Sequence, residues 1–233
     1  MNLLTSRFRA FFARAQDTRQ SRIAGMSSKR RVAKVWIGTS GYDYPDWKGT
    51  FYPEPLKSSE KFAFYRHRFS TVELNSTFYH FPRSTTIEKW RLQAGKGFVY
   101  SIKAWRVITH IRRLASCGRE LKDFLVRIEG LKETLGPVLF QLPPGFHCDR
   151  RRLKRFLRGL PRDFNFAVEF RHQSWIEEGI YEELRNRGVA VCRVSSPGMD
   201  GPTGVFTGSI AYWRLHGAHQ WYRGAYDTNE LRV

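Results

Sequence analysis

Cysteine is scarce in this 233-residue sequence, and its three copies stand far apart at Cys117, Cys148 and Cys192. An odd number at such spacings forms neither a CxxC metal motif nor a disulfide framework. We therefore expect reduced, structural thiols and a cytoplasmic protein. Long apolar runs are also missing, because none approaches the roughly 20 residues that a helix needs to cross a bilayer. The sequence thus predicts no membrane-spanning segment.

Acidic residues are outnumbered by basic ones, with 21 Asp and Glu against 40 Lys and Arg and a net charge of +19. Residues 1–34 hold nine of the bases and one acid, whereas the other 199 residues hold 31 bases and 20 acids. The acid-poor N-terminal stretch, with phenylalanines among its arginines, is typical of targeting peptides. We predict that residues 1–31 form a basic extension, disordered or targeting-like, and that residues 32–233 form one domain. Translation from Met26 and a nonspecific basic arm are alternatives for the extension.

No GxGxxG turn follows the first predicted strand, which weakens a dinucleotide-binding interpretation. The chain instead alternates short apolar runs with amphipathic segments, and Gly, Pro or polar residues separate them. This alternation predicts a parallel α/β sheet, and the number of units favours a TIM-barrel-like (β/α)8 fold. The predicted strands cover residues 32–42, 72–75, 98–104, 138–142, 164–170, 189–194 and 210–215. The predicted helices cover residues 59–69, 85–93, 121–135, 153–160 and 176–184. Residues 43–56, 76–80 and 109–110 are predicted loops, and the four aromatic residues of the first loop indicate that it folds over another part of the chain.

The eighth strand of such a barrel is missing from this pattern. Only seven strands are predicted, and a helix is predicted to begin near Asn229, just before the last residue, Val233. A barrel closes its edges only when every strand is present, so seven strands would leave two edges unpaired. We therefore expect a copy that is truncated before the last strand.

Polar side chains gather at the carboxyl ends of the predicted strands, where parallel barrels carry their active sites. Spacing by two places three pairs on common faces, because side chains alternate along a strand. These pairs are Glu73 with Asn75, Glu169 with Arg171, and Arg214 with His216. Ser40, Tyr42, Lys103 and Gln141 end three further strands and would share the same rim.

The residue types on this rim predict acid–base chemistry on a small polar or anionic substrate. Glu73, Glu169 and His216 are the candidate catalytic groups, because a desolvated carboxyl can be tuned toward neutral pH. Asn75, Gln141 and three basic side chains are candidates for substrate binding, since guanidinium and ammonium groups hold anions. The basic candidates are Lys103, Arg171 and Arg214, and the aromatic side chains that would cover the substrate are Tyr42, Trp47, Tyr79, Trp175, Trp221 and Tyr222.

Each candidate also has a structural interpretation that stays open. Glu169 and Arg171 can satisfy each other, Glu73 can anchor backbone amides, and His216 can be a packed histidine. The long aliphatic side chain of Lys103 can carry its ammonium group to solvent. No HxH or HExxH spacing is present, so we predict no metal site, and the sequence indicates no particular cofactor. The bases of residues 150–158 favour a solvated helix face over contact with phosphates, and no nucleic-acid-binding motif is present.

Six segments, in the same order, resemble the YecE-like family, a family built on a domain of unknown function. They are IGTSGYDYPDWKGTFYP from Ile37, TVELNSTFYHFP from Thr71, FVYSIKAWRVITH from Phe98, LFQLPPGF from Leu139, VEFRHQSW from Val168, and YWRLHG from Tyr212 with Tyr222 and Tyr226. The resemblance implies a TIM-barrel-like fold and no settled reaction. It marks the rim residues above as a pocket and adds to them Gly41, Phe78, Thr109, His110, Gly217 and Tyr226.

The chain departs from this family in two places. Members usually carry an acidic residue near the end of the sixth strand, where this sequence has Ser195 and Ser196, and they continue into a last strand with an asparagine pair. Both differences fall on the barrel mouth. We therefore keep three hypotheses: an enzyme acting on a small polar or anionic substrate, a nucleic-acid- or polyanion-binding module, and an inactive truncated product.

Overall fold

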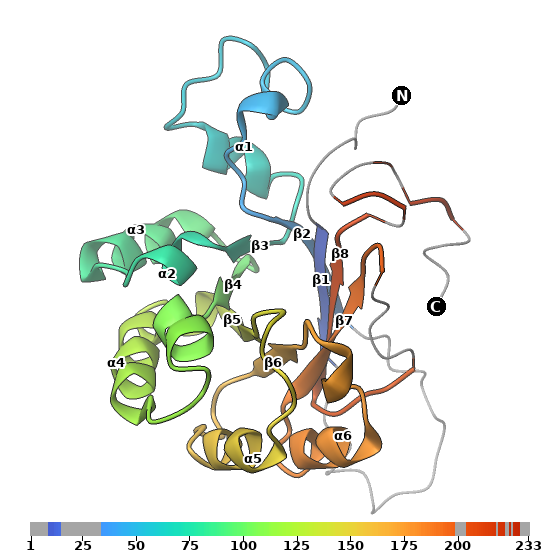
Figure 1. The fold of residues 1–233 in the computed structure, drawn as a ribbon. Helices are drawn as coiled ribbons and strands as arrows, with labels where there is room; N and C mark the ends of the chain where they lie inside the picture. Colours follow the sequence, from blue (N-terminus) through green and yellow to red (C-terminus); the bar gives the residue numbers. More distant parts are fainter. Residues whose placement is uncertain are drawn as a thin grey trace, which may run out of the picture.

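Seven parallel strands follow one another around the sheet in sequence order (Figure 1). The computed structural model describes residues 9–14, 34–198, 204–217, 219–221, 224 and 226–228. Each strand pairs with the next along the chain, which is the arrangement that strand–helix alternation predicts. The strands are β2 (Lys34–Ser40), β3 (Thr71–Leu74), β4 (Val99–Lys103), β5 (Leu135–Gln141), β6 (Phe166–Glu169), β7 (Ala190–Ser195) and β8 (Ile210–Leu215).

Amphipathic helices cover the outside of this sheet and bury their apolar stripes against it. In α4, for example, Leu121, Phe124 and Ile128 are buried on one face. The helices are α1 (Lys61–Arg66), α2 (Ser76–Tyr79), α3 (Ser84–Ala94), α4 (Gly118–Glu129), α5 (Arg150–Arg158) and α6 (Glu178–Arg185). Short helical turns η1 (Pro45–Trp47), η2 (Val107–Ile111), η3 (Lys132–Thr134) and η4 (Gln173–Trp175) lie between them.

An eighth strand, β1 (Arg9–Arg14), closes the barrel from the N-terminal side. It runs antiparallel to both neighbours, with Phe11 opposite Ile37 of β2 and opposite Trp213 of β8. The two edges that we expected to be unpaired are therefore both covered. The predicted (β/α)8 barrel is confirmed only as a seven-stranded parallel α/β sheet, because the closing strand is antiparallel and precedes the others. The rest of the predicted extension, residues 1–8 and 15–31, lies outside the described residues.

Three local predictions differ from the structure. Residues 76–80, predicted as a loop, begin with α2, whose Thr77 hydroxyl lies 2.9 Å from the Leu74 carbonyl oxygen and 2.7 Å from that of Lys103. The predicted loop at residues 109–110 belongs to the π-helical turn η2. The predicted helix 121–135 ends at Glu129, and Lys132 then takes a left-handed φ of 51°. The apolar periodicity continues beyond the end of α4 because the next turn and β5 face the same core, and the predicted helix was therefore too long.

The aromatic residues of the 43–56 loop pack together with α1 rather than facing solvent. Trp47 is buried and stacks on Tyr65 with ring centroids 6.5 Å apart and an interplanar angle of 8°. The Tyr65 hydroxyl accepts a hydrogen bond from the Thr39 amide at 2.8 Å and donates to the Thr71 carbonyl at 2.9 Å. This loop thus folds over the start of the barrel, as its aromatic content predicted.

The three cysteines are free thiols, and Cys117 and Cys192 are buried. Reduced structural thiols were expected, whereas the cytoplasmic location stays a prediction. None of the helices in the described part of the chain combines the length and the apolar character that crossing a bilayer requires.

Candidate functional site

The interior of the barrel carries apolar side chains toward the amino ends of its parallel strands and polar side chains at their carboxyl ends. A small buried cluster that includes Trp36, Leu139, Ala167 and Cys192 fills the lower interior. Because side chains alternate, residues two positions further along the same strands point inward at the mouth. In this way β6 leads from Ala167 to Glu169. The same rule places Ser40, Glu73, Gln141 and Arg214 inside the mouth.

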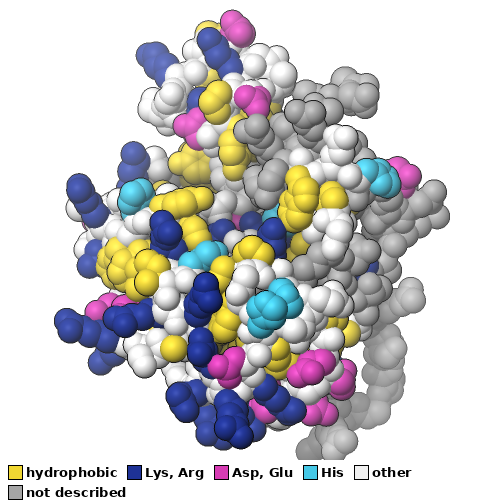
Figure 2. All heavy atoms as spheres, viewed as in Figure 1, with side chains coloured by type: hydrophobic (Ala, Val, Ile, Leu, Met, Phe, Trp, Pro, Cys, Tyr) yellow, Lys and Arg dark blue, Asp and Glu magenta, His cyan; other side chains and the backbone are white. Residues whose placement is uncertain are grey.

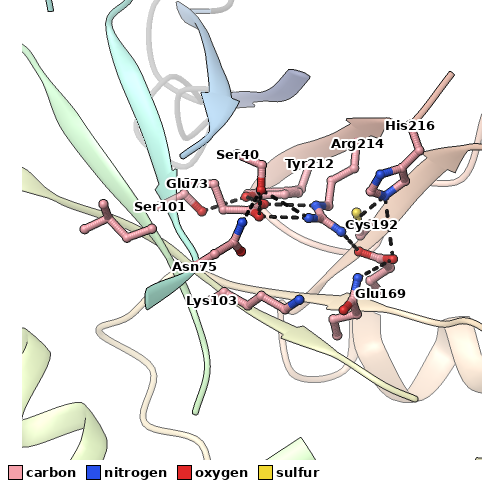
Figure 3. Close-up of polar contacts among 12 residues, drawn as sticks. Ser40, Glu73, Asn75, Ser101, Lys103, Glu169, Cys192, Tyr212, Arg214 and His216 are labelled. Atoms are coloured by element: carbon pink, nitrogen blue, oxygen red, sulfur yellow. Dashed lines mark hydrogen bonds and ion pairs between the residues drawn. The ribbon is translucent and has the colours of Figure 1, made fainter. Parts of the chain in front are cut away.

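One guanidinium joins the two buried carboxylates of this mouth (Figure 3). Arg214 binds Glu73 in bidentate fashion, with Nε 3.0 Å from Oε2 and Nη2 2.8 Å from Oε1. Its Nη1 donates to Oε2 of Glu169 at 2.6 Å. Arg214 is 3% exposed, and both glutamates are fully buried. Strands β3, β6 and β8 therefore meet in one buried ionic network, as the spacing of their polar residues predicted.

Neighbouring side chains donate further hydrogen bonds to both carboxylates. Glu73 accepts hydrogen bonds from Ser40 Oγ at 2.6 Å and from the Tyr212 hydroxyl at 2.8 Å. Glu169 Oε1 accepts from Gln141 Nε2 at 2.9 Å and from Arg171 Nη1 at 3.0 Å. A buried carboxylate is costly unless it is paired and hydrogen-bonded, and here both conditions are met.

This network determines the ionisation of both glutamates. Burial by itself raises the pKa of Glu73, but the Arg214 guanidinium and the Ser40 hydrogen bond outweigh it and lower that pKa below its ordinary value. For Glu169, burial is likewise outweighed by Arg214, His216 and Arg171, so its pKa is also lowered. Both carboxylates are therefore ionised at neutral pH. We had expected an upward shift, which would suit general acid–base catalysis, and the opposite shift follows from the guanidinium.

His216, two residues after Arg214, is 2% exposed and remains neutral at pH 7. Burial and then the Arg214 charge lower its pKa to about 4. Its Nε2 lies 3.2 Å from Arg214 Nη1. Since a guanidinium only donates, Nε2 is the acceptor, and the neutral ring carries its proton on Nδ1.

Lys103 ends β4 and shares its inward face with Ser101, whose Oγ lies 2.7 Å from the Tyr212 hydroxyl. The Lys103 ammonium sits 4.2 Å above the centre of the Phe78 ring and makes no hydrogen bond or ion pair with any residue that the structure describes. Burial, followed by the nearby Arg214 charge, lowers the pKa of Lys103 to about 8. Of the basic groups at the mouth, Lys103 thus comes closest to exchanging a proton near neutral pH.

His110 packs against the same phenylalanine. Its ring centroid is 4.8 Å from that of Phe78, and its Nδ1 is 2.9 Å from Thr109 Oγ1. Burial and the charge of Lys103 lower the pKa of His110 to about 4. The π-helical turn that carries His110 leads into a loop in which Arg113, Leu114 and Ser116 have positive φ. Such turns and strained backbones gather at functional sites.

Several predicted aromatic contacts lie away from the ionic network. Tyr42 packs on Phe62 and, with Trp47, belongs to the cluster around α1. Trp175 is fully buried, donates its Nε1 hydrogen to the Phe146 carbonyl at 2.6 Å and stacks on Phe170. Tyr42, Trp47 and Trp175 therefore pack against other aromatic side chains rather than around the ionic network.

The other predicted aromatic residues lie nearer the outside or cannot be placed. Tyr79 is 61% exposed. The Tyr226 hydroxyl accepts a hydrogen bond from the Gly217 amide at 2.9 Å and lies 3.1 Å from Ser195 Oγ. Trp221 packs near His216 with centroids 5.8 Å apart. The prediction for Tyr222 falls outside the described residues.

Sequence reasoning missed two inward hydroxyls, Tyr212 and Ser101. Tyr212 connects Ser101 to Glu73 through hydrogen bonds of 2.7 and 2.8 Å. The alternation of side chains could have identified both. Tyr212 precedes Arg214 by two residues and Ser101 precedes Lys103 by two, so each pair lies on the same face of its strand.

The charged groups of the mouth do not balance. Glu73 and Glu169 contribute two negative charges, whereas Lys103, Arg171 and Arg214 contribute three positive ones. In the described part of the chain, no group of three or more His, Cys, Asp or Glu side chains is arranged to hold a metal ion. A partly desolvated site with surplus positive charge attracts an anion.

Two curated proteins are similar to this sequence. The UPF0759 protein YecE of Escherichia coli (strain K12) is 32% identical over 156 residues, which cover 66% of this chain and 55% of YecE. The UPF0759 protein YunF of Bacillus subtilis (strain 168) is 28% identical over 160 residues, which cover 64% of this chain and 55% of YunF. The chain thus matches about half the length of these relatives.

Solved structures agree with the fold. A DUF72 family protein from Thermotoga maritima superimposes with a TM-score of 0.64 at 33% identity, covering 73% of this chain and 70% of that one. A DUF72 family protein from Enterococcus faecalis, 18% identical, gives a TM-score of 0.55. The match covers 64% of this chain and 66% of the Enterococcus faecalis chain. Residues 36–233 match the family described as "Protein of unknown function DUF72". The chain therefore belongs to the DUF72 family.

Proposed function

We propose that the chain is an enzyme whose barrel mouth binds a small anionic substrate and transforms it by acid–base chemistry. The observation that carries the proposal is the surplus positive charge of the buried network. Three cations face two carboxylates, and both carboxylates are already engaged by Arg214. An anionic group of the substrate would complete the balance.

Arg171 and Lys103 are the groups proposed to receive this anion. Arg171 uses one N–H for Glu169, and its remaining guanidinium N–H groups have no hydrogen-bond partner among the described residues. Its planar side chain also lies 5.0 Å from the Trp221 ring, which restrains its orientation. A guanidinium with free donors binds carboxylate or phosphate in bidentate fashion.

Asn75 is proposed to accept a hydrogen bond from the substrate. Its Nδ2 donates to Ser40 Oγ at 2.5 Å, whereas its buried Oδ1 has no partner among the described residues. A buried acceptor without a donor costs about 1–3 kcal/mol, so a bound hydroxyl or N–H group would be favoured here. The substrate class is therefore a small anion that also carries a hydrogen-bond donor.

Proton transfer is assigned to Lys103 and to the neutral histidines rather than to the glutamates. The pKa of Lys103 is lowered to about 8, and those of His110 and His216 to about 4. An amine that loses its proton near neutral pH suits a general base. Glu73 and Glu169 then act as fixed charges that orient Arg214.

A thermal-shift screen tests this proposal. Phosphate, small carboxylates and sugar phosphates are compared at constant ionic strength with neutral sugars of similar size. A ligand at 100 times its Kd stabilises the native state by about 2.7 kcal/mol, so binding anions should raise the Tm by several degrees. Arg171→Met and Lys103→Met should lose this shift, whereas Arg158→Met, on the exposed side of α5, should keep it. Equal shifts from neutral sugars, or retention by Arg171→Met, would contradict anion binding at the mouth.

Binding of a polyanion is the second candidate, because basic side chains follow α5 along the lower edge of the face in Figure 2. Arg150 and Lys154 are engaged with Glu183, at 3.2 and 3.0 Å. The exposed side chains that make no ion pair with the described residues are Arg151, Arg155 and Arg158. These three are available for phosphates.

A further inference from the structure

We propose that Lys103 forms an imine with its substrate, which makes the substrate an aldehyde or ketone that also carries an anionic group. The inference deepens the proposed function, on which its anionic part rests. It names the reacting atom, the Lys103 Nζ, and the bond that forms. The imine itself depends only on the surroundings of this lysine.

The position of Lys103 gives its amine access to a bound molecule. It is the last residue of β4, it points into the mouth, and it is partly rather than fully buried. Figure 3 shows its side chain extending from β4 toward Arg214 and Glu169 with no interaction drawn to either. The Lys103 amine thus lies inside the site and stays available to a bound molecule.

The contacts of Lys103 differ from those of a structural lysine. The Lys103 ammonium ends on neither carboxylate of the mouth, and both carboxylates are engaged by other donors. Its ammonium instead rests on the Phe78 ring at 4.2 Å, and that ring meets His110 in a T-shaped arrangement with centroids 4.8 Å apart. An aromatic face attracts an ammonium less strongly than a carboxylate does, so it opposes loss of the Lys103 proton only weakly.

The charges around Lys103 favour its nucleophilic form. Burial acts first, followed by the like charge of Arg214, and the pKa falls to about 8 in spite of Glu73 and Glu169. Such a pKa leaves roughly a tenth of the amine neutral at pH 7, against fewer than about one in a thousand for an ordinary lysine. A desolvated lysine beside another cation is a recognised form of activated amine.

The proposed step balances without an oxidant or reductant. The neutral Nζ attacks the carbonyl carbon, a C–N bond forms, and the carbonyl oxygen takes up a proton to give a carbinolamine. The C–O bond then breaks, and the oxygen leaves as water. Overall, an ammonium and a carbonyl yield a protonated imine and one water, whose two hydrogens come from the ammonium.

Trapping by borohydride tests the imine. The full chain is incubated at pH 7.5 with pyridoxal 5′-phosphate, an aldehyde that carries an anion, or with glyoxylate, a smaller one, and is then reduced. Peptide mass spectrometry compares Lys103 with Lys89, an exposed lysine of α3. We expect at least tenfold faster labelling of Lys103, an imine absorbance band with pyridoxal 5′-phosphate, and loss of this band in Lys103→Met. Lys89→Met should leave both unchanged.

The outcomes separate the imine from the anion site. Labelling of Lys103 by both probes no faster than that of Lys89 would overturn the imine, even if phosphate still protects the fold through Arg171. Equal rates for pyridoxal and pyridoxal 5′-phosphate, with Lys103 still selectively labelled, would overturn the anionic part that comes from the proposed function. A faster rate with the phosphate, reduced by Arg171→Met, supports both parts.

Discussion

Arg214 decides the state of two other residues at once, because it is the shared counterion of Glu73 and Glu169. Replacing it by Met would leave two buried carboxylates, whereas Glu73→Gln removes one charge and keeps the shape. Breaking a buried ion pair costs about 3–5 kcal/mol per orphaned charge. We therefore expect Arg214→Met to lose more than about 5 kcal/mol in urea denaturation and Glu73→Gln about 3 kcal/mol.

A triple variant provides the control for this prediction. Glu73→Gln, Glu169→Gln and Arg214→Met together leave no buried charge among these three positions, so much of the lost stability should return. Arg158→Met, on an exposed position, should stay within about 0.5 kcal/mol of the parent. A stable Arg214→Met protein would show that the carboxylates do not depend on this guanidinium.

His110 makes stability depend on pH on the acid side. Its pKa is about 4 in the folded chain and 6.5 in the unfolded chain, so between these values the unfolded state binds more protons. Stability therefore falls as the pH drops from 6.5 toward 4, by about 1 kcal/mol at pH 5 after allowance for partial exposure. His110→Asn should show a smaller loss between pH 7.5 and pH 5.0 in urea titrations. The same variant of exposed His67 should behave like the parent, and an unchanged loss in His110→Asn would contradict the shift.

At the scale of elements, Tyr65 of α1 ties β2 to β3. Its hydroxyl is the partner of the buried Thr39 amide and of the Thr71 carbonyl. Tyr65→Phe would remove both hydrogen bonds, and we expect a loss of about 1–3 kcal/mol together with faster hydrogen exchange at the Thr39 amide. Tyr79→Phe, at a side chain that is 61% exposed, is the matched control. An unchanged exchange rate at Thr39 would show that this link is not needed.

The strands also show which features of the fold and the site the sequence can predict and which it cannot. Alternation within β8, predicted over Ile210–Leu215 and found there, identified Arg214 as inward-facing. The convergence of Glu73, Glu169 and Arg214 followed from counting along separate strands. The direction of the pKa shifts could not follow from it, because it depends on which side chains touch across the mouth. The pairing of β1 with β8, almost the whole chain away, likewise leaves no local pattern.

At the scale of the whole molecule, the net charge of +19 sets up a test between small anions and polyanions. Nonspecific binding of a labelled oligonucleotide should weaken steeply with salt, since each phosphate contact releases a counterion. We expect such binding to be lost near 0.2 M salt and in the triple Gln variant of Arg151, Arg155 and Arg158. That variant should retain stabilisation by small anions. Oligonucleotide binding that resists salt and depends on Lys103 would instead make the mouth a nucleic-acid site.

We expect the mouth to keep its glutamates ionised and to leave Lys103 as the group that exchanges protons. A ¹³C NMR titration of protein labelled with [ε-¹³C]lysine, with the Lys103 signal assigned by its absence in Lys103→Met, tests this claim most directly. We expect a midpoint near pH 8 for that signal. A midpoint above about pH 10, where ordinary lysines titrate, would contradict it.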